Sequence, residues 1–218
     1  MNITNYILND FEPLTLQSSV NMAKKLCKKN TISHIPIVND TILIGCFSQN
    51  DIQSLENKEQ KLFEFIDLFE HFNANNGVSV LELLKVFADN DTNIIPVIHK
   101  NKYVGYFELN VVLEAFSSSP FLSANGFVLV VEKNSKEHSM SEAAQIIESN
   151  NAVLLGCFIS KRTPEKVELT LKISSEEINE IIQTFRRYNY LIITDHTDDF
   201  YLEELKNRAD YLQKYLNT

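Results

Sequence analysis

Ser48 and Asp51 stand three residues apart, directly after the largely apolar run at residues 42–47 and at the start of an expected helix. An aspartate carboxylate can accept two hydrogen bonds from a vicinal diol. The free backbone amides at the start of a helix favour a phosphate. Ser-x-x-Asp at such a position is also a variant of the capping box, which needs no ligand. The pattern by itself therefore leaves two interpretations, a binding element and a helix cap.

The stretch around these residues recurs sixty positions later without a gap. SHIPIVNDTILIGCFSQNDIQSL occupies residues 33–55, and NIIPVIHKNKYVGYFELNVVLEA occupies residues 93–115. A fixed period of this kind indicates a doubled structural unit. The shared register pairs Pro36 with Pro96, Gly45 with Gly105, Phe47 with Phe107 and Asn50 with Asn110.

Each copy predicts a helix, two strands and a closing helix. Apolar residues follow one helix face over residues 20–27 and again over 80–87, with Ser18 or Ser19 and then Ser79 as candidate N-caps. Apolar runs around Asn- and Asp-type turn residues predict a β-hairpin in each copy. One copy has too few layers to close a core, so the two copies are expected to stack about a pseudo-twofold axis. The closing helices are expected over residues 49–56 and 109–116, and the link at residues 56–72 fits either a helix or a short strand.

The second half of the chain predicts a different fold. SSSPFLSANG, residues 117–126, has the small and polar composition of a linker. After it, the order of elements is β-α-β-β-α-β, a ferredoxin-like unit. Its strands are expected over residues 126–134, 152–160, 166–174 and 190–196, and its helices start near Ser139 and Ser174.

Two capping boxes and a leucine seam accompany this second unit. Ser139 with Glu142, and Ser174 with Glu177, have the spacing of reciprocal helix caps. A final helix is expected from Asp198 to Asn217, where apolar residues recur at heptad spacing. That seam fits either packing on its own domain or pairing with another chain; its residues are Leu202, Leu205, Ala209, Leu212 and Leu216.

Composition excludes several functional classes. A formal net charge of −9 argues against a general nucleic-acid binder, which needs a basic face. No apolar run reaches the ~18 residues of a membrane span, and the N-terminus lacks the basic start of a signal peptide, so a cytoplasmic protein is expected. Cys27, Cys46 and Cys157 are expected to be reduced thiols. The histidines form no zinc-type spacing, and no P-loop or GxSxG occurs, so neither a metal nor an enzyme is expected.

The doubled unit resembles a pair of CBS domains, the tandem called a Bateman module. The resemblance rests on His34–Val38, Leu43–Gly45, Phe47–Ser48 and Asp51–Ile52, and in the second copy on Ile94–Ile98 and Tyr103–Phe107. The β-α-β-β-α-β part is similar to an ACT-type regulatory domain, and the combined layout is similar to the acetoin-utilisation B type. The predicted organisation is CBS unit 1 at 1–58, CBS unit 2 at 59–117, a linker at 118–125, an ACT-like domain at 126–196 and a C-terminal helix at 197–218.

This resemblance implies a ligand and its contacts. CBS pairs commonly hold AMP, ATP or S-adenosylmethionine in the cleft between the copies, and they commonly dimerise. By the family pattern, Ser48 reaches a phosphate and Asp51 holds the ribose, while Ser33 and His34 precede the strand of Pro36, where the family's backbone touches adenine. Glu108 and Val111 stand at the matching positions of the second copy. A glutamate repels a phosphate and a valine cannot hold a diol, so the family pattern implies at most one usable nucleotide site per chain.

The sequence therefore predicts a cytoplasmic, non-enzymatic regulatory protein of mixed α/β fold, a homodimer that senses an adenine nucleotide or a related adenosyl ligand. The alternative is a ligand-free dimerisation or interaction scaffold. A regulated protein partner fits either class, whereas nucleic acid and membrane do not. The loop at residues 132–138 lacks the Gly and Pro that ACT effector loops usually have, so amino-acid binding is not expected there.

Overall fold

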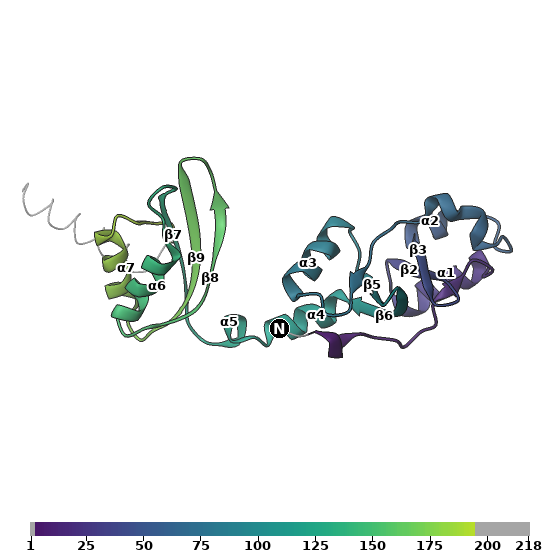
Figure 1. The fold of residues 1–218 in the computed structure, drawn as a ribbon, viewed down its shortest axis with the longest axis horizontal. Coiled ribbons are helices and arrows are strands. Elements are labelled where there is room, and N and C mark those ends of the chain that lie inside the picture. Colours follow the sequence, from purple (N-terminus) through teal and green to yellow (C-terminus); the bar gives the residue numbers. More distant parts are fainter. Residues whose placement is uncertain (1–2, 195–218) are drawn as a thin grey trace, which may run out of the picture. The chain divides into compact units, whose positions relative to one another are not determined.

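The computed structural model describes residues 3–194, and the chain divides into two compact units after Ser118 (Figure 1). The first unit carries the doubled motif, and the second carries the β-α-β-β-α-β pattern. The helix expected from Asp198 to Asn217, with its leucine seam, lies outside the described residues.

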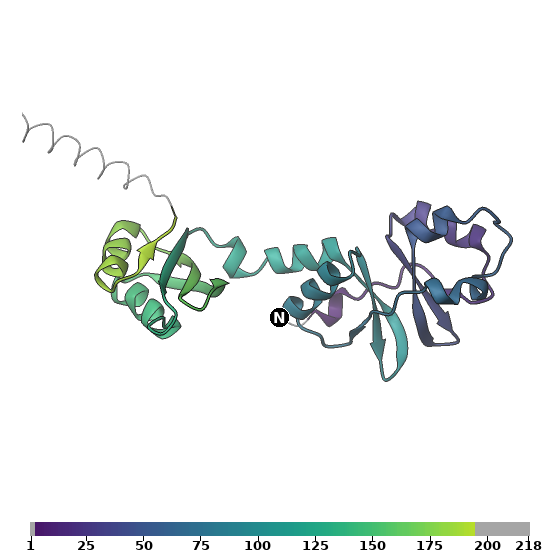
Figure 2. The ribbon, with the colours of Figure 1, turned by 90° about the horizontal axis from the view of Figure 1, so that it is seen from above.

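The first unit contains two three-stranded sheets, one per copy of the repeat (Figure 2). In each sheet a short strand pairs in parallel with the first strand of an antiparallel hairpin. The sequence allowed either a helix or a short strand for the link between the copies. The link forms a 3-10 helix, η2 (Leu62–Leu68). The first copy comprises β1 (Leu14–Thr15), α1 (Val20–Asn30), β2 (His34–Asn39), β3 (Ile42–Ser48) and α2 (Gln49–Ser54); the second comprises β4 (Ala74–Asn75), α3 (Val80–Asp89), β5 (Ile94–His99), β6 (Lys102–Glu108) and α4 (Leu109–Ser117), and a short η1 (Thr4–Tyr6) precedes both.

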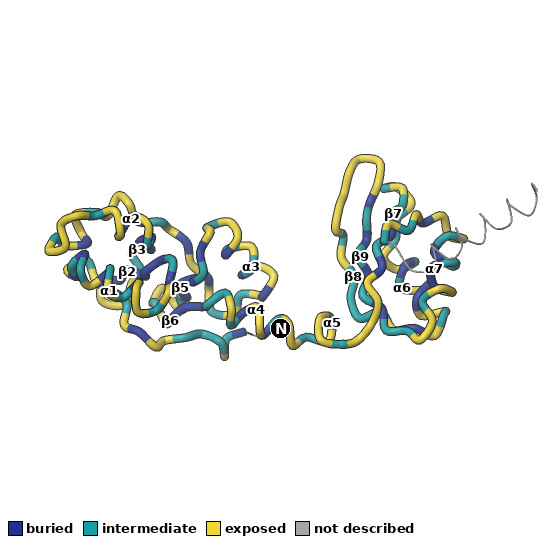
Figure 3. Tube along the Cα trace, turned by 180° about the vertical axis from the view of Figure 1, so that it is seen from behind, coloured by how far each residue is buried: buried dark blue, intermediate teal, exposed yellow. Residues whose placement is uncertain are grey.

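The strand register confirms the repeat residue by residue. His34 pairs with Ser48 in the first hairpin, and Ile94 pairs with Glu108 in the second. The same offset of sixty holds for every other pair of the two hairpins, and the irregularity after Ile37 recurs after Val97. Pro36 and Pro96, and likewise Gly45 and Gly105, therefore occupy equivalent strand positions, as the sequence predicted. Figure 3 shows the first strand of each hairpin largely buried and the hairpin tips exposed.

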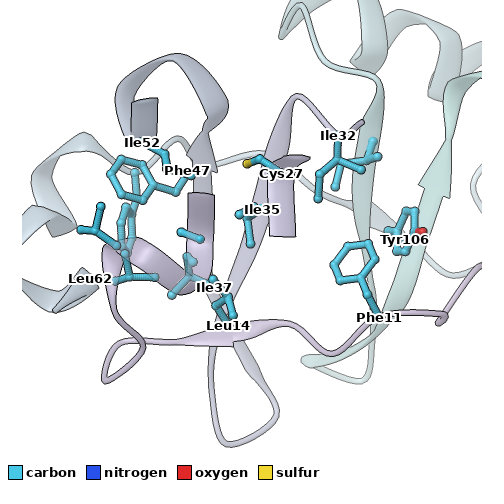
Figure 4. Close-up of a cluster of buried hydrophobic side chains, with 14 residues drawn as sticks. Phe11, Leu14, Cys27, Ile32, Ile35, Ile37, Phe47, Ile52, Leu62 and Tyr106 are labelled. Carbon is cyan, nitrogen blue, oxygen red and sulfur yellow. The ribbon is translucent and has the colours of Figure 1, made fainter. Parts of the chain in front are cut away.

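The cores of the two copies interlock. Phe47 lies at 0% exposure in a core that also takes Ile94 and Tyr106 from the second copy (Figure 4). The other core, built on the second copy, takes Ile3 from the N-terminus and Cys46 from the first copy. Burying apolar surface of both copies in shared cores makes each copy dependent on the other. Packing therefore crosses the boundary at residues 58/59 that the repeat suggested.

Ser33 and Asn93 occupy equivalent positions of the two copies and bind each other. The Ser33 amide donates to Asn93 Oδ1 at 2.8 Å, and the Asn93 amide donates to Ser33 Oγ at 2.9 Å. Asn93 Nδ2 also donates to the Thr31 carbonyl at 2.9 Å. A reciprocal contact between equivalent residues lies at the pseudo-twofold axis, so these bonds join the copies where their symmetry relates them.

We expect Asn93→Ala to lower the free energy of unfolding by about 1–3 kcal/mol, because it leaves the half-buried Ser33 amide and the Thr31 carbonyl without their partners. Urea unfolding followed by circular dichroism would measure this loss. Asn57→Ala is the control, since that exposed side chain bonds only a neighbouring amide, of Glu59. Equal stability of the two variants would contradict a structural role for the axis contact.

The second unit has the predicted β-α-β-β-α-β order. Its four strands form an antiparallel sheet in the order β10-β7-β9-β8. Burial alternates along β9, and the two helices contribute to the same buried cluster as β7 and β9, so the helices cover one face of the sheet (Figure 1). The elements are β7 (Phe127–Asn134), α6 (Met140–Ser149), β8 (Val153–Arg162), β9 (Lys166–Ser174), α7 (Ile178–Arg187) and β10 (Leu191–Ile192).

Local details of this unit differ from the prediction. The expected linker contains a short helix, α5 (Pro120–Ser123), whose Phe121 lies against Gly156. Ser139 caps α6 by accepting from the Glu142 amide, but the Glu142 carboxylate does not return the bond. The Glu142 carboxylate instead accepts from the Lys133 ammonium and from the Tyr190 hydroxyl, which tertiary packing brings within reach.

The second expected box and the last strand were also wrong in detail. Ser174 ends β9, and Glu177 occupies the N-cap of α7 without a side-chain bond to the helix. The last strand covers Leu191–Ile192 rather than residues 190–196, of which 195 and 196 lie outside the described residues. No helix within residues 3–194 is long and apolar enough to cross a membrane.

Candidate functional site

A polar pocket of about 430 Å³ lies at the junction of the two copies. This volume falls within the range of small-molecule sites in proteins, ~300–1,000 Å³. The first copy contributes the open end of its hairpin and the start of α2, and the second copy contributes the loop between α3 and β5. The lining residues are Ser33, His34, Ser48, Gln49, Asn50, Glu70, Asp89, Asn90 and Asp91.

Backbone pairing explains why these residues meet. His34 and Ser48 face each other as the terminal pair of the β2–β3 hairpin. Glu70 is placed beside them by a two-bond bridge with Cys46, in which each amide donates to the other residue's carbonyl at 2.8 Å. The axis contact between Ser33 and Asn93 brings the α3–β5 loop to the same point. The pocket is therefore fixed by the first hairpin, by the link that carries Glu70 and by the contact between the two copies.

Ser48 and Asp51 form the helix cap that was one of their two interpretations. Ser48 Oγ accepts from the Asp51 amide at 3.1 Å and donates to Asp51 Oδ2 at 2.6 Å. Ser48 lines the pocket, whereas Asp51 is not among its lining residues. Pro36 is buried within β2, opposite Cys46, and it also lies outside the lining. The structure thus gathers Ser33, His34 and Ser48, and ligand contacts by Asp51 and Pro36 stay predictions.

His34 is the buried polar centre of the pocket, with 5% of its surface exposed. Its Nδ1 lies 2.9 Å from Ser33 Oγ, and its Nε2 lies 3.2 Å from Glu70 Oε1. Because a carboxylate accepts, we assign the Nε2 proton to the bond with Glu70 and let Nδ1 accept from the serine. The Phe72 ring also packs against the imidazole, nearly perpendicular to it and with ring centroids 5.3 Å apart. The imidazole is thereby held in one orientation.

The Ser33–His34–Glu70 chain has the residue types of a hydrolytic triad, but its serine is engaged on several sides. Ser33 Oγ accepts from the Asn93 amide at 2.9 Å and lies 3.1 Å from Thr92 Oγ1, besides its contact with His34. A nucleophilic serine must instead present its oxygen to a substrate carbonyl. These three hydrogen-bonded side chains are therefore better explained as polar contacts where the two copies meet.

The lining carries negative charge. Glu70, Asp89 and Asp91 contribute three carboxylates, and none of the lining residues is Lys or Arg. Asp89 is paired with Lys85 at 2.6 Å, but both side chains are more than half exposed, so solvent weakens that pair. Behind the pocket, burial and then the Glu70 carboxylate raise the pKa of the Cys46 thiol. That thiol donates to the Phe72 carbonyl and is structural.

The second copy lacks this constellation. Ile94 and Glu108 stand where the first copy has His34 and Ser48. Glu108 occupies the N-cap of α4 without forming a side-chain cap bond. The asymmetry predicted from the sequence therefore has a structural counterpart, since only the first hairpin ends in a capping serine opposite a histidine.

Sequence reasoning missed Glu70 and the acidic wall at Asp89 and Asp91. The sixty-residue register could have pointed to the wall, because the residues just before Asn93 must approach Ser33 if the axis passes between them. Nothing in the sequence indicated Glu70, which belongs to the unrepeated link. Among residues 3–194, no group of three or more His, Cys, Asp or Glu side chains could hold a metal ion.

Comparison with known proteins finds similarity to solved structures alone. No protein-family model matches the chain, and no curated protein matches it. A CBS domain pair/ACT domain protein from Thermotoga maritima is 15% identical, with a TM-score of 0.48 over 53% of this chain and 96% of that chain. The acetoin utilization protein AcuB from Vibrio cholerae is 21% identical, with a TM-score of 0.45 over 53% and 90%. CBSX2, solved in complex with AMP, is 14% identical, with a TM-score of 0.45 over 53% and 95%. The chain is thus similar to tandem CBS pairs, as the repeated motif indicated.

Proposed function

We propose that residues 3–118 form a non-enzymatic regulatory module that binds an adenine nucleotide or a related adenosyl ligand in the pocket. One observation carries this proposal: Ser33, His34 and Ser48, singled out from the sequence, converge on a cavity whose walls come from both copies. A ligand there contacts both copies at once, and binding therefore stabilises one relative arrangement of them. Such coupling between binding and arrangement is what regulation requires.

The chemistry of the lining suits a purine nucleoside. Gln49, Asn50 and Asn90 offer side-chain amides, whose donors and acceptors are of the kind that recognise ring nitrogens and an exocyclic amine. Ser48 adds a hydroxyl to the lining. We further propose that the protein is cytoplasmic and forms a homodimer. The dimer is supported by Leu81 and Leu113, which are exposed on the adjoining helices α3 and α4. Light scattering that gives a mass of one chain, 25.1 kDa, would contradict the dimer.

The alternative function is a scaffold that needs no ligand. The observation in its favour is the Ser48–Asp51 cap, in which the two side chains already satisfy each other and an amide. The two functions differ in a simple measurement. A ligand at ~100 times its dissociation constant adds ~2.7 kcal/mol to the stability of the folded state, whereas a scaffold gains nothing. A thermal-shift series on the full chain with AMP, ATP and S-adenosylmethionine distinguishes them.

A matched pair of serine variants separates capping from binding. Ser48→Ala and Ser79→Ala each remove an N-cap, and each should cost about 1 kcal/mol of stability. Ser79 caps α3 and is not among the pocket's lining residues, so its variant should keep the full ligand-induced rise in melting temperature. Ser48→Ala should lose at least half of that rise. If both variants respond to ligand like the unmutated chain, the pocket is not the binding site.

A further inference from the structure

We propose that this pocket discriminates by charge and prefers adenosyl ligands that carry no negative charge or a positive one over nucleotides that carry phosphate. This inference rests on the proposed function and specifies the ligand class of that same pocket. It departs from the family pattern, in which Ser48 reaches a phosphate.

The acidic wall is held in place by its contacts. Glu70 is fixed through its backbone bridge to Cys46, and its carboxylate bonds the buried His34, so it cannot readily turn away from the pocket. Asp89 ends α3, where the helix carbonyls add negative potential of their own. Asp91 follows two residues later in the left-handed region, at a φ of 45°. These carboxylates line the side of the pocket that the second copy provides and the edge beside His34.

The start of α2 does not provide a phosphate site that would offset the negative charge of the wall. The Gln49 amide donates to the Ser33 carbonyl at 2.6 Å, and the Asp51 amide donates to Ser48 Oγ. Two of the first three amides of this six-residue helix are therefore already used. Lys24 is occupied elsewhere, since it donates to the carbonyls of Gln53 and Leu55. Lys85 pairs with the lining Asp89 through an exposed contact but is not itself among the lining residues.

The expected size of the effect follows from Coulomb's law. In a water-like medium, one pair of like charges ~8 Å apart weakens binding about twofold. Three carboxylates facing the double charge of a phosphate monoester give several such pairs, so AMP should bind at least about tenfold more weakly than adenosine. Salt screens exposed charges over ~10 Å at 0.1 M, and this difference should shrink as salt is raised.

Calorimetry on the full chain at low salt tests the inference with two ligand pairs. Adenosine and AMP differ by the phosphate, and S-adenosylmethionine and S-adenosylhomocysteine differ by the sulfonium charge. We expect adenosine to bind at least about tenfold more tightly than AMP, and the sulfonium compound more tightly than the thioether. Both differences should narrow in ~0.5 M sodium chloride. AMP binding as tightly as adenosine would overturn the inference and leave the proposed function intact, whereas no binding by any of the four would overturn the proposed function.

Variants that remove charge test whether the acidic wall causes the preference for adenosine over AMP. Asp89→Asn with Asp91→Asn keeps the side-chain shape, and asparagine tolerates the left-handed backbone at position 91. In this double variant, the ratio of the affinity for adenosine to the affinity for AMP should fall by at least about threefold. The control, Asp40→Asn with Asp67→Asn, removes two charges that do not line the pocket, one of them also from the left-handed region. Equal effects of the two double variants would overturn the assignment.

Discussion

Replacing Phe47 with alanine should lower the free energy of unfolding by about 3–5 kcal/mol, the largest effect expected of any substitution considered in this chain. Phe47 is fully buried, and its ring lies 5.1 Å from that of Phe69 and 6.3 Å from that of Phe65, between centroids. Truncation removes its transfer energy and leaves a cavity between the sheet and η2, whose close packing limits collapse. The loss also weakens the core that both copies share.

The control for this prediction is Phe63→Ala. Phe63 lies two residues from Phe65 in the same 3-10 helix, but half of its surface is exposed. Its truncation should change stability by no more than about 0.5 kcal/mol. Urea unfolding of the full chain, followed by circular dichroism, measures both. A loss below ~1 kcal/mol for Phe47→Ala would mean that the core around η2 is not packed as described.

Gly105→Ala should cost about 2–3 kcal/mol or more, for two separate reasons. Gly105 has a φ of 140°, a backbone conformation that residues other than glycine rarely adopt. A methyl group there would also collide with the Leu8 carbonyl oxygen and approach Ile7 Cγ2 to 2.8 Å. The Leu8 backbone cannot yield freely, because it exchanges two hydrogen bonds with Tyr106.

Gly77→Ala isolates the first of these reasons. Gly77 has a φ of 100°, but an added methyl group would meet nothing within 4 Å. Its substitution should therefore show the backbone strain alone, about 1 kcal/mol. The difference between the two variants measures how firmly residues 7–8 are held against β6. Equal losses would show that the N-terminal segment does not lie on that strand.

The fold of both units was predictable because local patterns and tertiary structure agree. The two hairpins follow from apolar runs around turn residues, and identities such as Pro36 with Pro96 and Gly45 with Gly105 set their register. The β-α-β-β-α-β order follows from changes of periodicity. The details that differ depend on tertiary contacts. Glu142 has the spacing of a capping box, yet Lys133 and Tyr190 take its carboxylate.

Other elements were ambiguous for local reasons. Residues 62–69 place apolar side chains at mixed spacings, so neither helical nor strand periodicity dominates over η2. The helix α5 begins with Pro120 at its first position, a known start signal, but the serines around it resemble a linker.

The candidate site was predictable only in its first copy. Ser33, His34 and Ser48 belong to the repeated motif, and the hairpin register brings the last two opposite each other. Glu70 joins them through a bridge to Cys46, which pairs segments that share no sequence pattern. The acidic character of the pocket, on which the proposed ligand preference depends, is visible only in the fold, which brings Asp89 and Asp91 to the same pocket as Ser33.

The central proposal is that this chain binds one adenosyl ligand, in the pocket at the junction of its two copies that His34 and Ser48 line. Calorimetric titration of the full chain with adenosine and with S-adenosylmethionine measures the stoichiometry directly. We predict one site per chain, because Ile94 and Glu108 replace His34 and Ser48 in the second copy. Two sites per chain would contradict the asymmetry, and the absence of binding at millimolar ligand would contradict the claim itself.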